Sequence, residues 1–394
     1  MGRARVLQEI RTMRFEEVYD RWTGQRLTQE EAADMLGVSE RQFRRQCRRY
    51  ESDGMDGLID LRLGQVSARR APVDEVLRLV NQYRDRYTGW TVKHFYSKYR
   101  ERKEPRSYNF VRLALQQAGL VAKAKRRGAH RRKRERKPLI GMMLHQDGSR
   151  HEWLPGQQHD LIVTLDDATT RIYSAFLVDE EDTMSSFAGV GEVVLECGLF
   201  NSLYTDRGSH YWHTAKAGGK VDKHNLTQFG RAMRQLGIEM IPAYSPEARG
   251  RSERAFGTLQ ARLPKELADA GITDMAKANR FLKRRFLPMY NREFMVTAAE
   301  TGSAFVPWIG ANLCDILCLQ EERTVRPDNC VAYDKKLLQI PADRHRCHYV
   351  KATVRVHEYP DRSLAIFHGP RRLAQYDANG KERKINTKAV ASVR

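Results

Sequence analysis

The chain has 394 residues, a formal net charge of +20 and 41% hydrophobic residues. A chain of this length is expected to form two to four domains, each with its own core. No apolar run approaches the ~18 residues of a membrane span, which excludes a transmembrane protein. The six cysteines are scattered and no signal peptide is recognisable, so we expect a reducing, cytoplasmic compartment rather than a disulfide-stabilised secreted protein.

The positive charge is concentrated in the first third of the chain. Residues 1–140 contain 34 Lys and Arg against 18 Asp and Glu, a net charge of +16, whereas residues 141–394 contain 35 against 31, a net charge of +4. A basic segment of this kind favours a polyanionic partner. We therefore expect nucleic-acid binding upstream of residue 140.

The first predicted domain contains two short helices joined by a tight turn. Thr28 with Glu31, and Ser39 with Gln42, each form a capping box, the motif in which a Ser or Thr precedes a Glu or Gln by three residues. Gly37 makes the turn between the two helices. This arrangement predicts a helix-turn-helix, the motif that places its second helix in the DNA major groove. The domain is expected over 1–62 and its two helices over 29–36 and 40–52.

The second helix of this motif has one apolar and one basic side. Phe43, Cys47 and Tyr50 are spaced to face the core. The polar residues outside that stripe are expected to contact DNA, although an ordinary solvated basic helix is the alternative. They are Arg41, Gln42, Arg44, Arg45 and Arg48.

A second helical domain is predicted over residues 71–120. Helical patterns follow Pro72 and cover 91–102, and Ser107 can cap a third helix that Gly119 ends. Three helices of this size suggest a second DNA-binding fold, with a plain structural three-helix domain as the alternative. Its candidate DNA-binding residues are Arg106, Asn109 and Arg112.

A basic linker is predicted over residues 121–138. Like charges at this density repel each other and resist folding alone, but they can neutralise DNA phosphates or enter a minor groove. A merely solubilising tether is the alternative. The residues expected on DNA are Lys123, Lys125, Arg126, Arg127, Arg131, Arg132, Lys133 and Arg134.

The third predicted domain, residues 139–292, alternates strand and helix patterns. Strands are expected over 139–144, 159–165, 171–178, 199–204 and 238–242, and helices over 183–197, 226–236 and 252–267. Three strands, helix, strand, helix, strand, helix is the order of an RNase H-like fold, an α/β class with a five-stranded mixed sheet. Residues 211–225 read as a polar loop insertion.

Three acidic residues of this domain are placed as a two-metal site would require. Asp147 follows the first apolar run, Asp206 follows the fourth strand, and Glu253 opens the last helix. Carboxylates on two strand ends and one helix can converge on divalent metals, and two metals can stabilise both the attacking and the leaving oxygen of a phosphodiester. The pattern predicts metal-dependent phosphoryl transfer on DNA.

The last predicted domain, residues 293–394, is β-rich. Short alternating runs separated by Pro and Gly turns suggest a small β-barrel. The spacing of Cys330, His345, Cys347 and His348 matches no standard zinc pattern. We therefore predict no zinc site there.

Four stretches of the chain resemble the bacterial insertion-sequence transposases with a DDE, retroviral-integrase-type core. They are residues 144–149, 204–211, 245–254 and 290–294, which include the sequences TDRGSHY and SPEARGRSER. Two features depart from the family pattern. Arg207 stands where the family commonly has Asn, and 46 residues separate Asp206 from Glu253, a longer gap than is usual. The insertion at 211–225 can account for that excess, because surface loops tolerate extra length.

The resemblance implies that Asp147, Asp206 and Glu253 are the catalytic, metal-binding residues. Asp166 and Asp167 compete with Asp147, but in the resembled fold the turn that they occupy is structural. Two Mg²⁺ ions per active site are implied, with Mn²⁺ as a substitute. Glu247 competes with Glu253 and is expected in a mobile loop before the helix.

The implied function is DNA transposition. The enzyme would cut at the element ends and join the resulting 3′-OH to target DNA. Its partners would be the terminal inverted repeats, the target DNA and at least one more copy of the chain in a synaptic complex. No membrane would be involved. The protein would be located in a bacterial cytoplasm, near the nucleoid. The alternatives are a DNA-binding regulator with an inert core, and an RNase H-like nuclease without strand transfer.

Overall fold

The computed structural model describes residues 2–60, 70–102, 104, 106–123, 135–214, 219–244, 246–310, 312–342 and 346–383, except for the side chains of 2–5 and 246–249. The chain divides into two compact units. One unit comprises Met1–Arg86 and Leu113–Leu120, and the other comprises Tyr87–Arg112 and Val121–Arg394.

The N-terminal helices form a helix-turn-helix as predicted. Thr28 makes a complete capping box with Glu31, and Ser39 accepts a hydrogen bond from the Gln42 amide. Gly37 adopts the left-handed conformation, φ 66°, that ends the first helix of the motif. The elements are α1 (Gly2–Thr23), α2 (Gln29–Leu36), α3 (Glu40–Asp53) and a 3-10 turn, Gly54–Leu58.

A small apolar core joins these three helices. Phe43 of α3 is completely buried, and its ring centroid lies 6.0 Å from that of Phe15 on α1. Cys47 is buried one turn after Phe43, and Tyr50 of the predicted stripe is half-buried. The apolar side of α3 therefore faces α1 and α2, as its spacing predicts.

The next three helices are α4 (Val73–Arg86), α5 (Val92–Glu101) and α6 (Tyr108–Gln117). Thr91 caps α5 by accepting a hydrogen bond from the His94 amide. The division into units runs through this predicted domain, because α5 belongs to the same unit as residues 121–394. His94 and Lys98 of α5 both contact the buried carboxylate of Glu266, at 2.8 and 2.7 Å.

A five-stranded mixed sheet lies at the centre of the larger unit. Its strand order is β3-β2-β1-β4-β7. The pairs β1–β2 and β2–β3 are antiparallel, and β1–β4 and β4–β7 are parallel. This is the order expected of an integrase-type core. The strands are β1 (Leu144–Leu154), β2 (Gln157–Asp166), β3 (Ile172–Val178), β4 (Ser202–Thr205) and β7 (Glu239–Pro242).

The prediction of the first strand at 139–144 is wrong. β1 begins at Leu144, where the predicted strand ends, and Gly141 lies in the preceding turn with φ 77°. The polar segment after Leu144 becomes the strand because the apolar β2 pairs with it along its length. Asp147 therefore lies inside β1 rather than after a strand.

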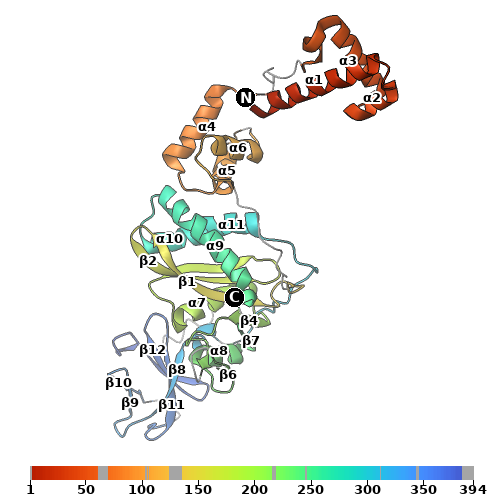
Figure 1. Cartoon of the computed structure of the whole chain (residues 1–394). Coiled ribbons are helices and arrows are strands. Elements are labelled where there is room, and N and C mark those ends of the chain that lie inside the picture. The colour runs from red at the N-terminus through yellow and green to blue at the C-terminus, as the bar shows by residue number, and fades with distance from the viewer. Residues whose placement is uncertain are drawn as a thin grey trace. The chain divides into compact units, whose positions relative to one another are not determined.

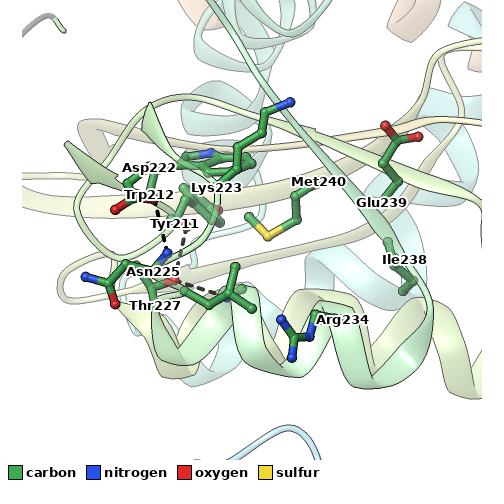
Figure 2. A pocket seen from close by; sticks show the side chains of 12 residues that line it. Tyr211, Trp212, Asp222, Lys223, Asn225, Thr227, Arg234, Ile238, Glu239 and Met240 are labelled. Carbon is green, nitrogen blue, oxygen red and sulfur yellow. Dashed lines mark hydrogen bonds between the residues drawn. The ribbon is translucent and has the colours of Figure 1, made fainter. Parts of the chain in front are cut away.

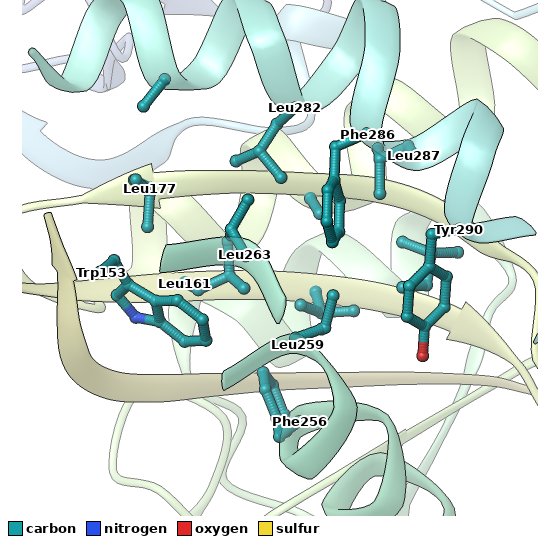
Figure 3. Packing of buried hydrophobic residues seen from close by; sticks show 14 of the residues in the cluster. Trp153, Leu161, Leu177, Phe256, Leu259, Leu263, Leu282, Phe286, Leu287 and Tyr290 are labelled. Carbon is teal, nitrogen blue, oxygen red and sulfur yellow. The ribbon is translucent and has the colours of Figure 1, made fainter. Parts of the chain in front are cut away.

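Helices cover both faces of this sheet (Figure 1). One face packs on α7 (Thr183–Cys197) and α8 (Gln228–Leu236) through a cluster that includes Phe187 and Phe229. The other packs on α9 (Pro246–Asp269) and the segments after it, where Leu259, Leu263 and Phe286 meet Leu161 of β2 (Figure 3). These segments are α10 (Met275–Phe281), a π-helical turn (Leu282–Phe286) and α11 (Leu287–Phe294).

The side-chain amide of Asn291 joins α11 to β3 through two hydrogen bonds. It donates to the Ile172 carbonyl at 2.8 Å and accepts from the Ile172 amide at 2.9 Å. The tyrosine–asparagine segment that carries part of the family resemblance thus holds a helix against the sheet.

The C-terminal region contains an open sheet of order β14-β13-β12-β11-β8 and a separate hairpin, β9–β10. The predicted β-barrel is not confirmed, because no pairing closes the sheet in the described part of the chain. A 3-10 turn, Leu313–Asp315, precedes these strands. They are β8 (Leu319–Thr324), β9 (Cys330–Tyr333), β10 (Lys336–Gln339), β11 (Thr353–Glu358), β12 (Leu364–His368), β13 (Arg371–Tyr376) and β14 (Glu382–Arg383). Among the residues described, none of the helices has the length and apolar character to cross a bilayer.

Candidate active site

Asp147 lies on β1 and Asp206 directly follows β4, the strand that runs parallel to it. The register aligns Leu144 with Leu203 and His145 with Tyr204, and the same register, continued by two residues, would align Asp147 with Asp206. Neighbouring strands lie about 4.8 Å apart, so aligned residues are neighbours in space. Asp147 is buried and Asp206, directly after β4, is half-buried.

These two aspartates point to the sheet face that α9 covers. Side chains alternate along a strand, so Asp147 shares a face with His145, whose ring lies 5.1 Å from that of Tyr204. Val163, which pairs with Asp147 across β2, belongs to the apolar cluster beneath α9. The carboxylate pair and α9 therefore lie on one side of the sheet.

Glu253 lies on the part of α9 that runs over β1. The Gln260 side-chain amide donates to Ser149 Oγ at 3.0 Å, which fixes this helix face above β1. Glu253 precedes Gln260 by two turns, about 10.5 Å, on the same face. Arg251 of α9 contacts Asp167, and Asp167 also bonds His145 of β1. The first turns of α9 therefore lie near the start of β1, where Asp147 is found.

The three predicted carboxylates are not gathered around one point in this structure. Across the described residues, no three His, Cys, Asp or Glu side chains lie close enough together to hold a metal ion. Glu253 is exposed on α9, whereas Asp147 lies on β1 and Asp206 directly after the neighbouring strand β4. The arrangement is thus an aligned aspartate pair with a third acid on the helix above it.

Asp166 and Asp167, the competitors of Asp147, are held by protein partners. Asp166 accepts hydrogen bonds from the Ala168 amide at 2.8 Å and from a tyrosine hydroxyl, and burial raises its pKa. Burial would also raise the pKa of Asp167, but its hydrogen bonds from His145 and the Lys137 amide, with the charge of Arg251, hold that pKa well below its usual range. Both acids stabilise the turn after β2, which supports Asp147 as the site residue.

The predicted loop position of Glu247 is wrong, because α9 begins at Pro246 and includes it. Proline suits the first turn of a helix, where its missing N–H is not needed. The side chain of Glu247 lies outside the described residues. Glu253, the other candidate, lies two turns before Gln260, which contacts β1.

Three residues near the aspartate pair were not singled out in the sequence. Glu181, His210 and Tyr211 contact one another beside Gly148, the residue after Asp147. A glycine inside a strand often marks a close approach by another group. Gly148 is the one sign in the sequence that another group packs against β1 at this point.

Arg207, the departure from the family pattern, holds the insertion. Its guanidinium donates to the Gly219 carbonyl at 2.8 Å and stacks 5.4 Å from the ring centroid of Tyr244. The insertion contains a short hairpin, β5 (His213–Thr214) and β6 (Val221–Asp222). The two differences from the family pattern are therefore linked, because Arg207 holds the insertion close to Asp206.

A cavity of about 280 Å³ lies between this hairpin, α8 and β7 (Figure 2). Trp212, Lys223, Arg234 and Met240 are among its lining residues. None of the three predicted carboxylates lines it, so the cavity is separate from the candidate site.

The predicted DNA-binding residues of α3 are all on its surface. Arg41, Gln42, Arg44, Arg45 and Arg48 are exposed, opposite the buried Phe43 and Cys47. In the second helical region Asn109 is exposed and Arg106 and Arg112 are half-buried. Lys123 is exposed, and the other predicted linker contacts lie outside the described residues. These are Lys125, Arg126, Arg127, Arg131, Arg132, Lys133 and Arg134.

Comparisons with known proteins agree with this architecture. A homeodomain-like domain model matches residues 17–59, which span the helix-turn-helix. The chain is 31% identical over 349 residues to the protein named "Putative transposase y4bF" of Sinorhizobium fredii, covering 86% of this chain and 75% of that protein. It is 33% identical over 162 residues to the transposase for insertion sequence IS1202 of Streptococcus pneumoniae, covering 41% of this chain and 34% of that protein.

Two solved structures overlap the chain more loosely. The intasome of simian T-cell lymphotropic virus, in complex with a PP2A regulatory subunit, gives a TM-score of 0.35 at 14% identity over 69% of this chain and 89% of that chain. The HTLV-2 integrase catalytic core with magnesium gives 0.30 at 15% identity, over 41% and 94%. Scores this low carry no weight for the present chain.

A helix-turn-helix followed by a β3-β2-β1-β4-β7 sheet between two helical layers defines a DNA-binding protein with an integrase-type core. With a relative of 31% identity matched over most of its length, the chain belongs to the bacterial insertion-sequence transposases.

Proposed function

We propose that this chain is a DNA transposase that cuts at the ends of its element and transfers the resulting 3′-OH into target DNA, using divalent metal ions. The observation that carries the proposal is the parallel pairing of β1 with β4, whose register, continued by two residues, would align Asp147 with Asp206 on the face beneath α9. Glu253 on that helix is the proposed third ligand.

The chemistry of these side chains fits magnesium. Carboxylate oxygens are the ligands that Mg²⁺ prefers, and two adjacent carboxylates repel each other unless a cation lies between them. When bound, two such ions would activate the attacking oxygen and stabilise the charge that builds on the phosphate and the leaving oxygen. Asp147, Asp206 and Glu253 would hold these ions. Mn²⁺, which accepts the same oxygen ligands, should substitute.

The protein's own residues would bring DNA to this site. The arginines of α3 would read the terminal inverted repeats in the major groove, and the linker would neutralise backbone phosphate. Two ends must meet for transposition, so at least a dimer is expected in the complex with DNA. The basic front of the chain and its helix-turn-helix support this division of roles.

A gel assay with labelled element-end DNA, a target plasmid and Mg²⁺ tests the proposal. We expect both cleaved ends and joined products. Cleavage without joining would indicate the nuclease without strand transfer. Specific binding without cleavage would indicate a regulator with an inert core.

Three single substitutions test the site within that assay. Asp147→Asn, Asp206→Asn and Glu253→Gln should each abolish cleavage and joining while leaving end binding intact. The matched control is Glu239→Gln, an exposed acid on the edge strand β7. Joined product from any one of the three variants would remove that residue from the site.

A further inference from the structure

A fourth acidic residue, Glu181, packs against β1, the strand that carries Asp147. Its carboxylate packs against the backbone of Gly148, so that a Cβ atom added there would lie 2.1 Å from Glu181 Oε2. Gly148 immediately follows Asp147 in β1. A side chain at this position would displace the Glu181 carboxylate, which approaches β1 from the face opposite to that of Asp147.

Two aromatic residues of the segment after Asp206 contact Glu181. His210 Nε2 lies 3.3 Å from Glu181 Oε1, and the Tyr211 hydroxyl donates to the same oxygen at 3.4 Å. His210 Nε2 is shielded from solvent and forms no hydrogen bond within the described part of the chain. Glu181 thereby connects the strand of the first aspartate with the loop of the second.

The segment that carries Glu181 is firmly placed. Its backbone amide donates to Asp160 Oδ2 at 2.8 Å, and the next residue, Asp182, caps α7 in a reciprocal capping box with Ser185. A helix start anchored at both the sheet and its own cap holds a side chain more precisely than a loop does. The position of Glu181 is therefore set by the fold.

Negative charge accumulates at this point. Tyr211 is fully buried, and its pKa is raised well above its ordinary value by burial and then by the charges of Glu181, Asp206 and Asp147. Three carboxylates thus act on one hydroxyl group, which also bonds Gln146 of β1 at 3.2 Å. A divalent cation at the aspartate pair would relieve this repulsion.

We propose that Glu181 is a positioning residue of the metal site, which increases the affinity of the Asp147–Asp206 pair for a divalent cation through its charge and through its contacts with His210 and Tyr211. The proposal rests on the function proposed above and adds a residue to its site. Residues that orient metal ligands from the outer shell typically change metal affinity by about 10- to 100-fold.

Mn²⁺ binding to the full chain without DNA, measured by electron paramagnetic resonance of the free ion, tests the proposal. Glu181→Gln keeps the shape of the side chain and removes its charge, and should weaken Mn²⁺ binding by about 10-fold. Glu180→Gln, the exposed neighbouring acid, is the matched control and should bind as the wild type does.

Two further variants guard against a folding defect. Glu181→Asp retains the charge and should recover part of the affinity. Gly148→Ala retains the carboxylate but displaces it from the strand, and should weaken binding as Glu181→Gln does. Circular dichroism melting of each variant shows whether the fold is kept.

The outcomes separate this proposal from the one on which it rests. Wild-type affinity in folded Glu181→Gln and Gly148→Ala, alongside a loss in Asp147→Asn, would overturn the role of Glu181 and leave the metal site standing. Equal Mn²⁺ binding in the wild type and Asp147→Asn would overturn the metal site itself, and the role of Glu181 with it.

Discussion

His94 of α5 lies 2.8 Å from Glu266 of α9, and both side chains are buried. Lys98, one turn after His94, contacts the other oxygen of the same carboxylate at 2.7 Å. The helix that carries Glu253 is thus fixed to a helix from the region predicted to bind DNA. This buried three-residue contact holds α5 against α9.

Removing the charge of Glu266 should destabilise the larger unit. Glu266→Gln leaves the ammonium group of Lys98 buried without its carboxylate, and breaking a buried pair in this way costs about 3–5 kcal/mol. Urea unfolding at neutral pH measures the loss. The matched control is Glu101→Gln, whose carboxylate lies 4.0 Å from the same ammonium group but is mostly exposed. A destabilisation below about 1 kcal/mol, the range of an exposed pair, or an equal one in the control, would contradict the assigned role of Glu266.

The C-terminal sheet should lose stability in mild acid through His357. Neither ring nitrogen of this buried side chain has a hydrogen-bond partner among the described residues, and burial, with nearby arginine charges, lowers its pKa to about 4. Its ordinary pKa is about 6.5, so the unfolded chain binds the proton more tightly. The neutral His357 ring therefore makes its full contribution to the free energy of unfolding above about pH 6.5. This contribution, on the order of 3 kcal/mol, is lost as the pH falls towards about 4.

His357→Phe tests this pH dependence, because the ring of His357 already stacks on Phe367 with centroids 4.1 Å apart. Hydrogen exchange of β11 and β12, followed from mildly acidic to neutral pH, should become less dependent on pH in the variant, after correction for intrinsic exchange. His368→Gln, on the same sheet and partly exposed, is the control and should keep the wild-type dependence. An unaltered profile in His357→Phe would rule out His357 as its source.

The exposed arginines of α3 should determine which DNA sequence is bound. Arg41→Ala and Arg45→Ala remove side chains near the start of the recognition helix, where base contacts are usual. Each should weaken binding to the terminal repeat by about 1–3 kcal/mol with a smaller effect on unrelated DNA. Fluorescence anisotropy on both duplexes measures the ratio. Arg21→Ala on α1, an exposed arginine paired with Glu17, is the control. Equal losses on the two duplexes would mean that α3 contacts phosphate only.

The linker should contribute to the salt dependence of binding. Replacing Arg131, Arg132, Lys133 and Arg134 by Gln should make the plot of log affinity against log salt shallower, by about 0.9 for each phosphate that the linker no longer neutralises. Anisotropy titrations between low and physiological salt give this slope. An unchanged slope would show that the linker does not touch phosphate.

Local signals in the sequence suffice for several elements. The caps at Thr28 and Ser39 and the turn at Gly37 define the helix-turn-helix, because all three act within a few residues. The helix predicted over 183–197 has the same bounds in the structure. In these segments local propensity and tertiary packing favour the same structure.

Features that depend on contacts between segments far apart in the chain cannot be predicted from the sequence. β1 is polar after Leu144 and becomes a strand only because β2 and β4 lie on either side of it. Glu181 is 33 residues after Gly148 in the chain and contacts it only when β3 and α7 are in place. The barrel predicted at the C-terminus is unconfirmed for the same reason, since alternation predicts strands but not whether a sheet closes.

The most direct test of the central claim is the anomalous scattering of Mn²⁺ in crystals of the chain bound to element-end DNA. We expect Mn²⁺ at the DNA 3′ end, bound by Asp147 and Asp206, with the Glu253 carboxylate drawn in from α9 to complete the site. A complex with the DNA end seated over β1 and β4, but with Mn²⁺ bound to none of these three carboxylates, would contradict it.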